Sequence, residues 1–100
     1  IEDAQTLEKL GCFSTVLEKI PHKLSEKISK KTKFPLIGIG AGNNVDGQVL
    51  VIHDLIGLTN EFNPRFIRRY LDLNSSIKSA VSQFIKDVKS SDFPSKDEMY

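Results

Sequence analysis

This sequence has little cysteine and no excess of charge of either sign. Each absence excludes some classes of protein. The chain has one cysteine in 100 residues. Cys12 therefore cannot form an internal disulfide, and its apolar surroundings predict a small core residue in a reducing compartment. With 14 basic and 13 acidic residues the net charge is +1, which argues against the basic face of a nucleic-acid binder.

Long apolar runs and short catalytic motifs are also missing. No run approaches the length of a membrane span and no basic-then-apolar leader is present, so we expect a cytoplasmic protein with no membrane partner. There is no internal repeat, no metal-finger spacing and no Gly-x-Ser-x-Gly nucleophile elbow. The chain opens at Ile1 directly into a helical pattern, which indicates a piece of something longer or a processed chain.

The most informative stretch, residues 34–54, predicts a strand, a glycine-rich loop and a second strand. The apolar runs at 36–39 and 48–52 contain no alternating polar residues, so we expect both strands to be buried on two faces. The glycines of this stretch permit either a tight turn or a ligand-binding loop at a strand end. They are Gly38, Gly40, Gly42 and Gly47. A dinucleotide fingerprint is excluded, because its third glycine would fall at Asn43.

Helices and strands alternate around this stretch. Helical spacing of apolar residues predicts helices, and a β-enriched run predicts one more strand. The helices are expected at residues 3–10, 20–31, 64–71 and 77–89, the last capped within 74–76, and the strand at 13–17. Residues 13–39 thus form a strand–helix–strand unit with two parallel strands. The direction of the third strand, which ends at His53 and Asp54, stays open.

Several polar residues have both a structural and a functional interpretation. His53 and Asp54 would face opposite sides of a strand, so adjacency does not make them an acid–base pair. The basic cluster at 65–69 either is exposed to solvent or ion-paired with Asp72 and Glu61, or it contacts an anion or a neighbouring subunit. Its members are Arg65, Arg68 and Arg69.

The predicted strands do not complete a sheet by themselves. Strands buried on both faces need neighbours, and at least two edges would lie bare. A complete (β/α)₈ barrel takes about 250 residues. We therefore predict an α/β fold, the C-terminal part of a (β/α)₈ TIM barrel. About three strands would occupy residues 1–58, and C-terminal helices and a tail of the same domain would occupy 59–100.

The runs VLEKIP (16–21), FPLIGIGAG (34–42) and DGQVLVIHDLIGL (46–58) occur in an order that resembles ketopantoate hydroxymethyltransferase (3-methyl-2-oxobutanoate hydroxymethyltransferase). The likeness covers essentially the whole chain and the C-terminal portion of a family member. It implies transfer of a hydroxymethyl group from 5,10-methylenetetrahydrofolate to 3-methyl-2-oxobutanoate, forming 2-dehydropantoate in pantothenate biosynthesis. It also implies a barrel fold, Mg²⁺ that chelates the keto acid, and a homo-oligomer, commonly a decamer joined by C-terminal helices.

Residue by residue, the resemblance makes Glu18 the strand-end carboxylate proposed as general base. Such a position lies on the catalytic face of a barrel, and proton removal next to a ketone needs a base whose pKa is raised by burial. Gly40, Gly42 and Asp46 would shape the same rim. The family's metal ligands, and the serine and lysine that hold the keto acid, are absent here. We therefore expect no magnesium site and no activity from this chain alone.

Two other functions stay open. One is another barrel lyase of the phosphoenolpyruvate/pyruvate kind, which the DGQVLVIHD run disfavours. The other is a non-catalytic half-barrel that assembles through the apolar stripe of residues 77–88. Sizing by light scattering would separate a self-sufficient monomer from a fragment that aggregates or needs a larger piece.

Overall fold

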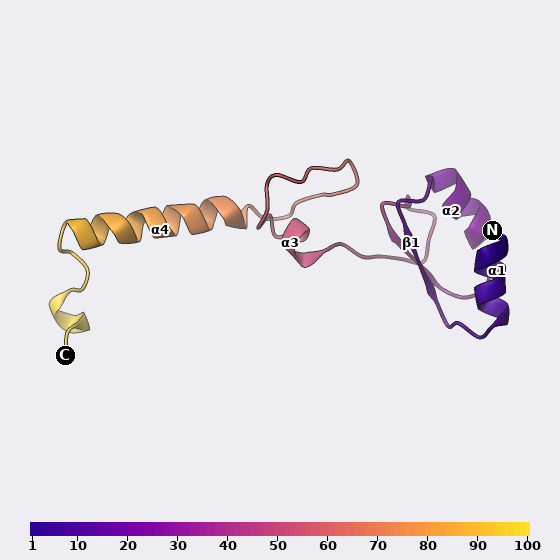
Figure 1. Ribbon diagram of the computed structural model, residues 1–100, viewed down its shortest axis with the longest axis horizontal. Coiled ribbons are helices and arrows are strands. Elements are labelled where there is room, and N and C mark those ends of the chain that lie inside the picture. Colours follow the sequence, from indigo (N-terminus) through magenta and orange to yellow (C-terminus); the bar gives the residue numbers. More distant parts are fainter. The chain divides into compact units, whose positions relative to one another are not determined.

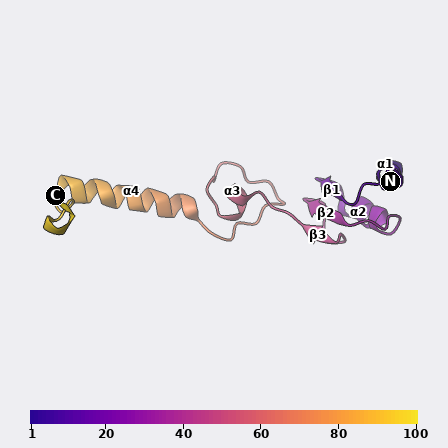
Figure 2. The same ribbon diagram turned by 90° about the horizontal axis from the view of Figure 1, so that it is seen from below.

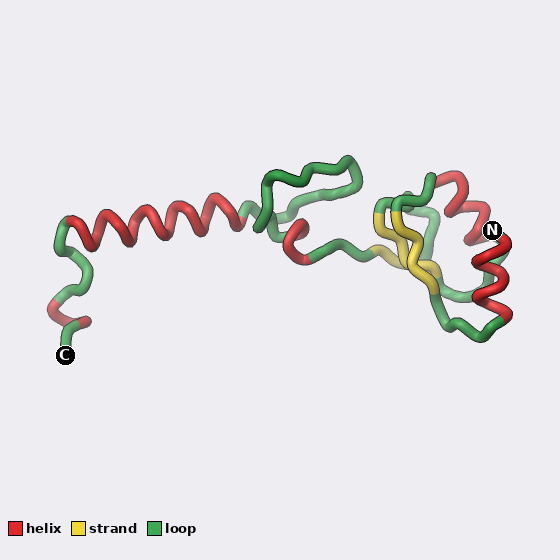
Figure 3. The backbone as a smooth tube through the Cα atoms, viewed as in Figure 1, coloured by secondary structure: helices red, strands yellow, loops and turns green.

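The computed structural model describes all 100 residues, which form two compact units. The first unit comprises Ile1–Val51 with Pro64–Ile67, and the second comprises Ile52–Asn63 with Arg68–Tyr100. All the strands belong to the first unit, while the second is helix and loop (Figure 3). None of the helices has both the length and the apolar character needed to cross a membrane.

The first unit is built around a three-stranded parallel sheet. Its elements are α1 (Glu2–Lys9), β1 (Thr15–Glu18), α2 (His22–Ser29), β2 (Leu36–Ile39) and β3 (Gly47–Gln48). The middle strand is β2, and β1 and β3 run parallel to it on either side (Figure 2). The predicted strand–helix–strand unit is confirmed, and the third strand, whose direction the sequence left open, is parallel.

Both helices of the first unit pack on one face of the sheet (Figure 1). The buried core draws on α1, α2, β1, β2 and the segments that flank β2. Its members are Ala4, Leu17, Ile28, Phe34, Leu36 and Ala41. Successive strand residues face opposite ways, so Val16 points to the other face, where it is 59% exposed. The expectation of strands buried on two faces is met only in part: Ile37 and Ile39 of β2 are half-buried, and Val49 and Val51 of the predicted third strand are about half-exposed.

Two local predictions in this unit fail for identifiable reasons. β3 ends at Gln48 rather than near residue 52, because its last backbone bond runs from Val49 N to the Gly38 carbonyl (2.9 Å). Val49 and the residues after it are no longer part of the sheet, and their side chains are about half-exposed. Cys12 is exposed rather than in the core. Gly11, with φ +89°, ends α1 and turns the chain outward before β1 begins.

The second unit joins two loop segments side by side. It contains α3 (Ile52–Leu55), α4 (Leu73–Lys89) and a short 3₁₀ turn, η1 (Lys96–Glu98). Three backbone amides of one segment donate to carbonyls of the other. They run from Tyr70 to Leu55 (2.8 Å), Leu73 to Ile56 (3.0 Å) and Asn74 to Gly57 (3.0 Å). The helix expected at 64–71 is therefore wrong, because these cross-segment bonds hold its C-terminal end in an irregular path.

The long helix α4 confirms the clearest amphipathic pattern in the sequence, although it starts earlier than expected. The cap is Asp72 rather than a residue within 74–76, because the Asp72 carboxylate accepts the Ser75 backbone N–H (3.1 Å) and the Ser75 hydroxyl (2.7 Å). The apolar stripe of α4 stays about half-exposed. It consists of Ile77, Val81, Phe84, Ile85 and Val88. Phe93 packs edge-on against Phe84, with ring centroids 5.3 Å apart.

Candidate functional site

The structure places Glu18 as the last residue of β1, at the carboxyl edge of the parallel sheet. It pairs in register with Ile39, the last residue of β2. The next residue, Lys19, has φ +52° and donates its backbone N–H to the Ile39 carbonyl (2.9 Å). A left-handed residue other than glycine costs about 1–3 kcal/mol, and such strain gathers at functional sites. The Glu18 side chain is exposed, so this chain alone does not supply the burial expected of the base.

Gly40 and Gly42 follow β2 on the same edge, and both need to be glycine. Gly40 (φ +64°) lies against Phe66, whose Cγ would be 2.9 Å from an added Cβ. Gly42 (φ +85°) lies against His22, whose Cβ would be 2.5 Å from an added Cβ. Positive φ and close approach both exclude a side chain. The two glycines thus let the loop pack closely on its neighbours at the edge where Glu18 lies.

Asp46, the third rim candidate, lies at the opposite edge of the sheet. It directly precedes β3 and binds Leu36, the first residue of β2. The Asp46 carboxylate accepts the Leu36 N–H (2.9 Å), and the Asp46 N–H donates to the Leu36 carbonyl (3.0 Å). The structure therefore does not bring Asp46 to the rim with Glu18. Its side chain is engaged in joining the amino ends of β2 and β3.

Gln48 was not singled out by the sequence, yet its side chain reaches this edge. The Gln48 Nε2 donates to the Gly42 carbonyl at 2.8 Å. Gln48 also pairs in register with Gly38 of β2. The only signal in the sequence is a polar residue that opens an apolar run, and that signal does not identify the partner six residues earlier.

The residues of this chain do not form a metal site. No group of three or more His, Cys, Asp or Glu side chains lies close enough together to hold an ion. His53 and Asp54 are in the four-residue helix α3, not at a strand end, so the strand argument about their opposite directions is wrong. Neither belongs to the unit that contains Glu18.

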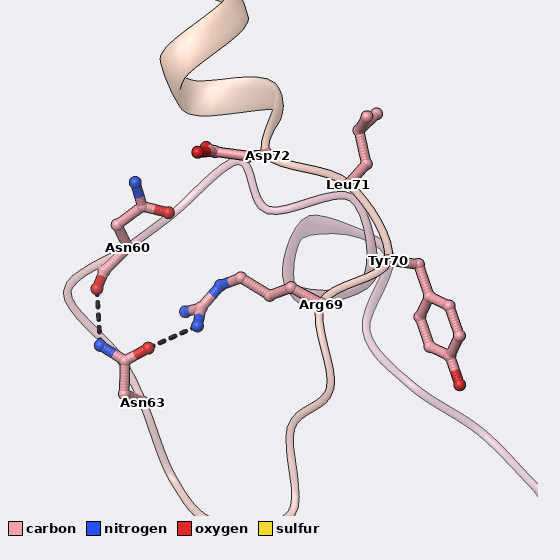
Figure 4. Close-up of a pocket in the computed structure, with 6 residues that line it drawn as sticks. All are labelled: Asn60, Asn63, Arg69, Tyr70, Leu71 and Asp72. Atoms are coloured by element: carbon pink, nitrogen blue, oxygen red, sulfur yellow. Dashed lines mark hydrogen bonds between the residues drawn. The ribbon is translucent and has the colours of Figure 1, made fainter.

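Arg65 and Arg68 of the basic cluster are exposed to solvent, as the structural interpretation expects, and no ion pair joins the cluster to Asp72 or Glu61. The one ion pair in the structure joins Lys30 and Glu26, outside the cluster. Arg69 instead donates to the carbonyls of Thr59 (3.0 Å) and Phe62 (2.7 Å) and to the Asn63 side chain. An open pocket of about 500 Å³ adjoins Arg69 (Figure 4). The Arg69 guanidinium already donates to groups of the loop, so it has little capacity left to bind an anion in the pocket.

Comparison with known proteins assigns the chain to a family. The family model of ketopantoate hydroxymethyltransferase matches residues 1–96. A 3-methyl-2-oxobutanoate hydroxymethyltransferase from Flavobacterium johnsoniae is 60% identical over 100 residues, which is all of this chain and 37% of that protein. Proteins of the same name are 56% identical over 98% of the chain in Christiangramia forsetii and 55% identical over all of it in Chlorobaculum tepidum, with 36% of each covered. The chain spans little more than a third of these relatives, and it belongs to the ketopantoate hydroxymethyltransferase family.

Proposed function

We propose that this chain is part of an enzyme that transfers a hydroxymethyl group from 5,10-methylenetetrahydrofolate to 3-methyl-2-oxobutanoate, forming 2-dehydropantoate in the cytoplasm. Membership of the family supports the reaction class. It also favours this reaction over a phosphoenolpyruvate/pyruvate-type lyase. The observation that carries the proposal is the position of Glu18, the last residue of a strand in a parallel sheet.

In the proposed reaction Glu18 takes a proton from the carbon next to the ketone of the keto acid. The resulting enolate carbon then forms a C–C bond to the methylene carbon of the folate. Both C–N bonds of that methylene bridge break, water supplies the hydroxyl oxygen, and tetrahydrofolate leaves with the proton from Glu18 and one from water on its two nitrogens. A carboxylate at the carboxyl end of a parallel strand is where α/β enzymes place such a group. Lys19 in its left-handed conformation turns the chain away immediately after Glu18, which leaves the carboxylate free at the edge.

Mg²⁺ belongs to the proposed reaction, but these residues do not fit it. They contain no group of three potential ligands, and a magnesium site needs carboxylates and other oxygen ligands around one ion. The proposal therefore assigns the ion and the contacts to the keto acid to the part of the relatives that this chain does not span. By the same reasoning, we propose that the 100-residue chain by itself is inactive.

The wider fold and assembly are part of the same proposal. Three parallel strands with helices on one face are consistent with the last strands of a (β/α)₈ barrel, in which an outer ring of helices covers the strands. The half-exposed stripe of α4 supports its use in joining subunits of a homo-oligomer.

A hybrid enzyme tests the proposal. The 100 residues replace the matching segment of the Flavobacterium johnsoniae relative, with which they share 60% identity. We expect the hybrid to form 2-dehydropantoate in the presence of Mg²⁺ and 5,10-methylenetetrahydrofolate, and the 100-residue chain alone to form none. E18Q keeps the shape of the side chain but removes the base, so kcat should fall about 100-fold or more.

The matched control is E26Q on α2, where an exposed glutamate pairs only with Lys30. We expect it to leave turnover unchanged. A folded hybrid that makes no product would contradict the proposed reaction for this segment. A hybrid in which E18Q stays within threefold of the parent would remove Glu18 from the proton transfer.

A further inference from the structure

The loop at 40–46 connects two parallel neighbours without a helix. β2 ends at Ile39 and β3 begins at Gly47, and parallel pairing places their starts at the same edge. The seven residues between them must therefore return from the carboxyl edge to the amino edge. Ala41 is fully buried and Val45 packs on the core, whereas Gly42, Asn43 and Asn44 between them are exposed. The loop therefore contacts the core near its two ends, and its middle faces solvent.

Hydrogen bonds hold this loop near both of its ends. At the amino edge, the two bonds between Asp46 and Leu36 hold its end. Near the carboxyl edge, the Gln48 amide donates to the Gly42 carbonyl at 2.8 Å. Gln48 is the only side chain that hydrogen bonds to Gly42, so its bond is the polar restraint on the glycine turn.

Gly38 makes room for the Gln48 side chain to reach the loop. A Cβ added at Gly38 would lie 3.2 Å from the Gln48 Oε1 and 3.0 Å from the Val45 Cγ2. Contacts of this length are tighter than ordinary van der Waals contact, so a larger residue would displace Gln48 or the loop. The lack of a side chain at Gly38 therefore leaves the space in which the Gln48 side chain reaches the Gly42 carbonyl.

We propose that Gln48 is a positioning residue, whose amide holds the Gly42 carbonyl and so fixes the glycine turn at the edge where Glu18 lies. Gly42 is held between Gln48 and the first residue of α2, His22. β1 and β2 end together at this edge, because Glu18 and Ile39 are in register. The inference rests on the proposed function for its effect on turnover. The effect on the loop follows from the hydrogen bond alone.

The test uses the hybrid enzyme with two substitutions of nearly equal shape. Q48M has the length of glutamine but no donor, and Q48E can donate only when its carboxyl is protonated. Loss of one positioning hydrogen bond predicts a fall in kcat of about tenfold for Q48M, with little change in KM. For Q48E, the ratio of its kcat to that of the parent should rise as the pH falls from about 8 to 5, because the protonated form regains the donor.

Q83M is the control, since Gln83 also donates its amide to an acceptor, Asp87 (2.7 Å), but lies on α4. It should change none of these quantities. Hydrogen exchange gives a readout that does not need activity. The Asp46 and Val49 amides, which donate to the Leu36 and Gly38 carbonyls, should exchange about tenfold faster in Q48M, with amides of α2 unchanged.

The outcomes separate the two proposals. An inactive hybrid whose loop exchanges faster in Q48M contradicts the reaction but supports the hold of Gln48 on the glycine turn, which does not depend on turnover. An active hybrid in which Q48M matches the parent in kcat and in exchange overturns the inference. Faster exchange with unchanged kcat, or a flat Q48E ratio across the pH range, also overturns it, because the bond would then be structural only.

Discussion

Single residues at the carboxyl edge show how little space the sheet leaves there. Gly42 has φ +85° and lies against His22, whereas Gly11 has nearly the same φ, +89°, with nothing within 4 Å of an added Cβ. Substitution of Gly11 therefore tests the free-energy cost of the left-handed backbone alone, and substitution of Gly42 tests that cost together with a steric clash.

Substitution by alanine at these two positions should give unequal losses of stability. G11A carries only the left-handed backbone penalty, about 1–2 kcal/mol. G42A carries that penalty and also a collision with the His22 side chain, so its loss should be at least twice as large. Thermal unfolding midpoints of the hybrid enzyme measure both. Equal shifts for the two variants would show that His22 moves aside at little cost.

The residue scale is also where sequence reasoning about the site succeeds and fails. Glu18 lies at a strand end as predicted, because a β-enriched run followed by proline identifies that end well. The family resemblance predicts Asp46 at the same rim as the glycines. The loop reverses across the sheet, however, so the two ends of a seven-residue segment lie at opposite edges. Neither that reversal nor the bond from Gln48 to Gly42 is encoded in a local pattern.

At the scale of elements, the spacing of apolar residues within a single helix or strand predicts that element correctly. The βαβ unit and α4 both follow from their apolar spacing. The strand predicted at 48–53 forms only at Gly47–Gln48. The helix predicted at 64–71 does not form, because bonds to groups distant in the sequence hold Arg69 and Tyr70. The Tyr70 N–H donates to the Leu55 carbonyl, and the Arg69 guanidinium donates to the carbonyls of Thr59 and Phe62. These bonds compete with the hydrogen bonds of a helix over residues 64–71.

The start of α4 should depend on pH through Asp72. Hydrogen bonds from the Ser75 hydroxyl and the Ser75 backbone N–H lower the pKa of the Asp72 carboxyl from its usual 3.8. A lowered folded pKa means that the carboxylate stabilises the helix above the unfolded value and that this stabilisation is lost as the pH falls through the folded value. A peptide of residues 70–90 should therefore lose helicity below about pH 4.

Circular dichroism of the peptide at 222 nm measures this change. D72N keeps a capping side chain that does not titrate, so it should lack the Asp72 part of the transition while retaining helicity at pH 7. D72A should be less helical than the parent at pH 7. Identical acid transitions in the parent and D72N would assign the change to Asp87 instead.

On the scale of the whole molecule, the exposed stripe of α4 is the feature that most needs a partner. Five large apolar side chains, each 44–52% exposed, follow one side of the helix. Such a surface usually marks an interface. In the proposed homo-oligomer the stripe would be buried between subunits.

A charge placed in this stripe should weaken assembly. V81K introduces a lysine into the middle of the stripe, and S79K introduces the same charge on the opposite side of the helix. Light scattering of the hybrid should show a smaller particle mass for V81K and the parental mass for S79K. If both variants keep the parental mass, the stripe is covered within a subunit rather than between subunits.

The doubly anchored loop at 40–46 also has an implication for how this segment can be altered. Bonds to Leu36 and Gln48 hold it near both ends. An inserted or deleted residue would therefore have to shift the glycine turn or break one of these bonds. The irregular segment around Thr59–Asn63 spans no sheet and is closed by a single arginine. Changes in chain length, such as epitope or tag insertions, are better placed there than among the glycines.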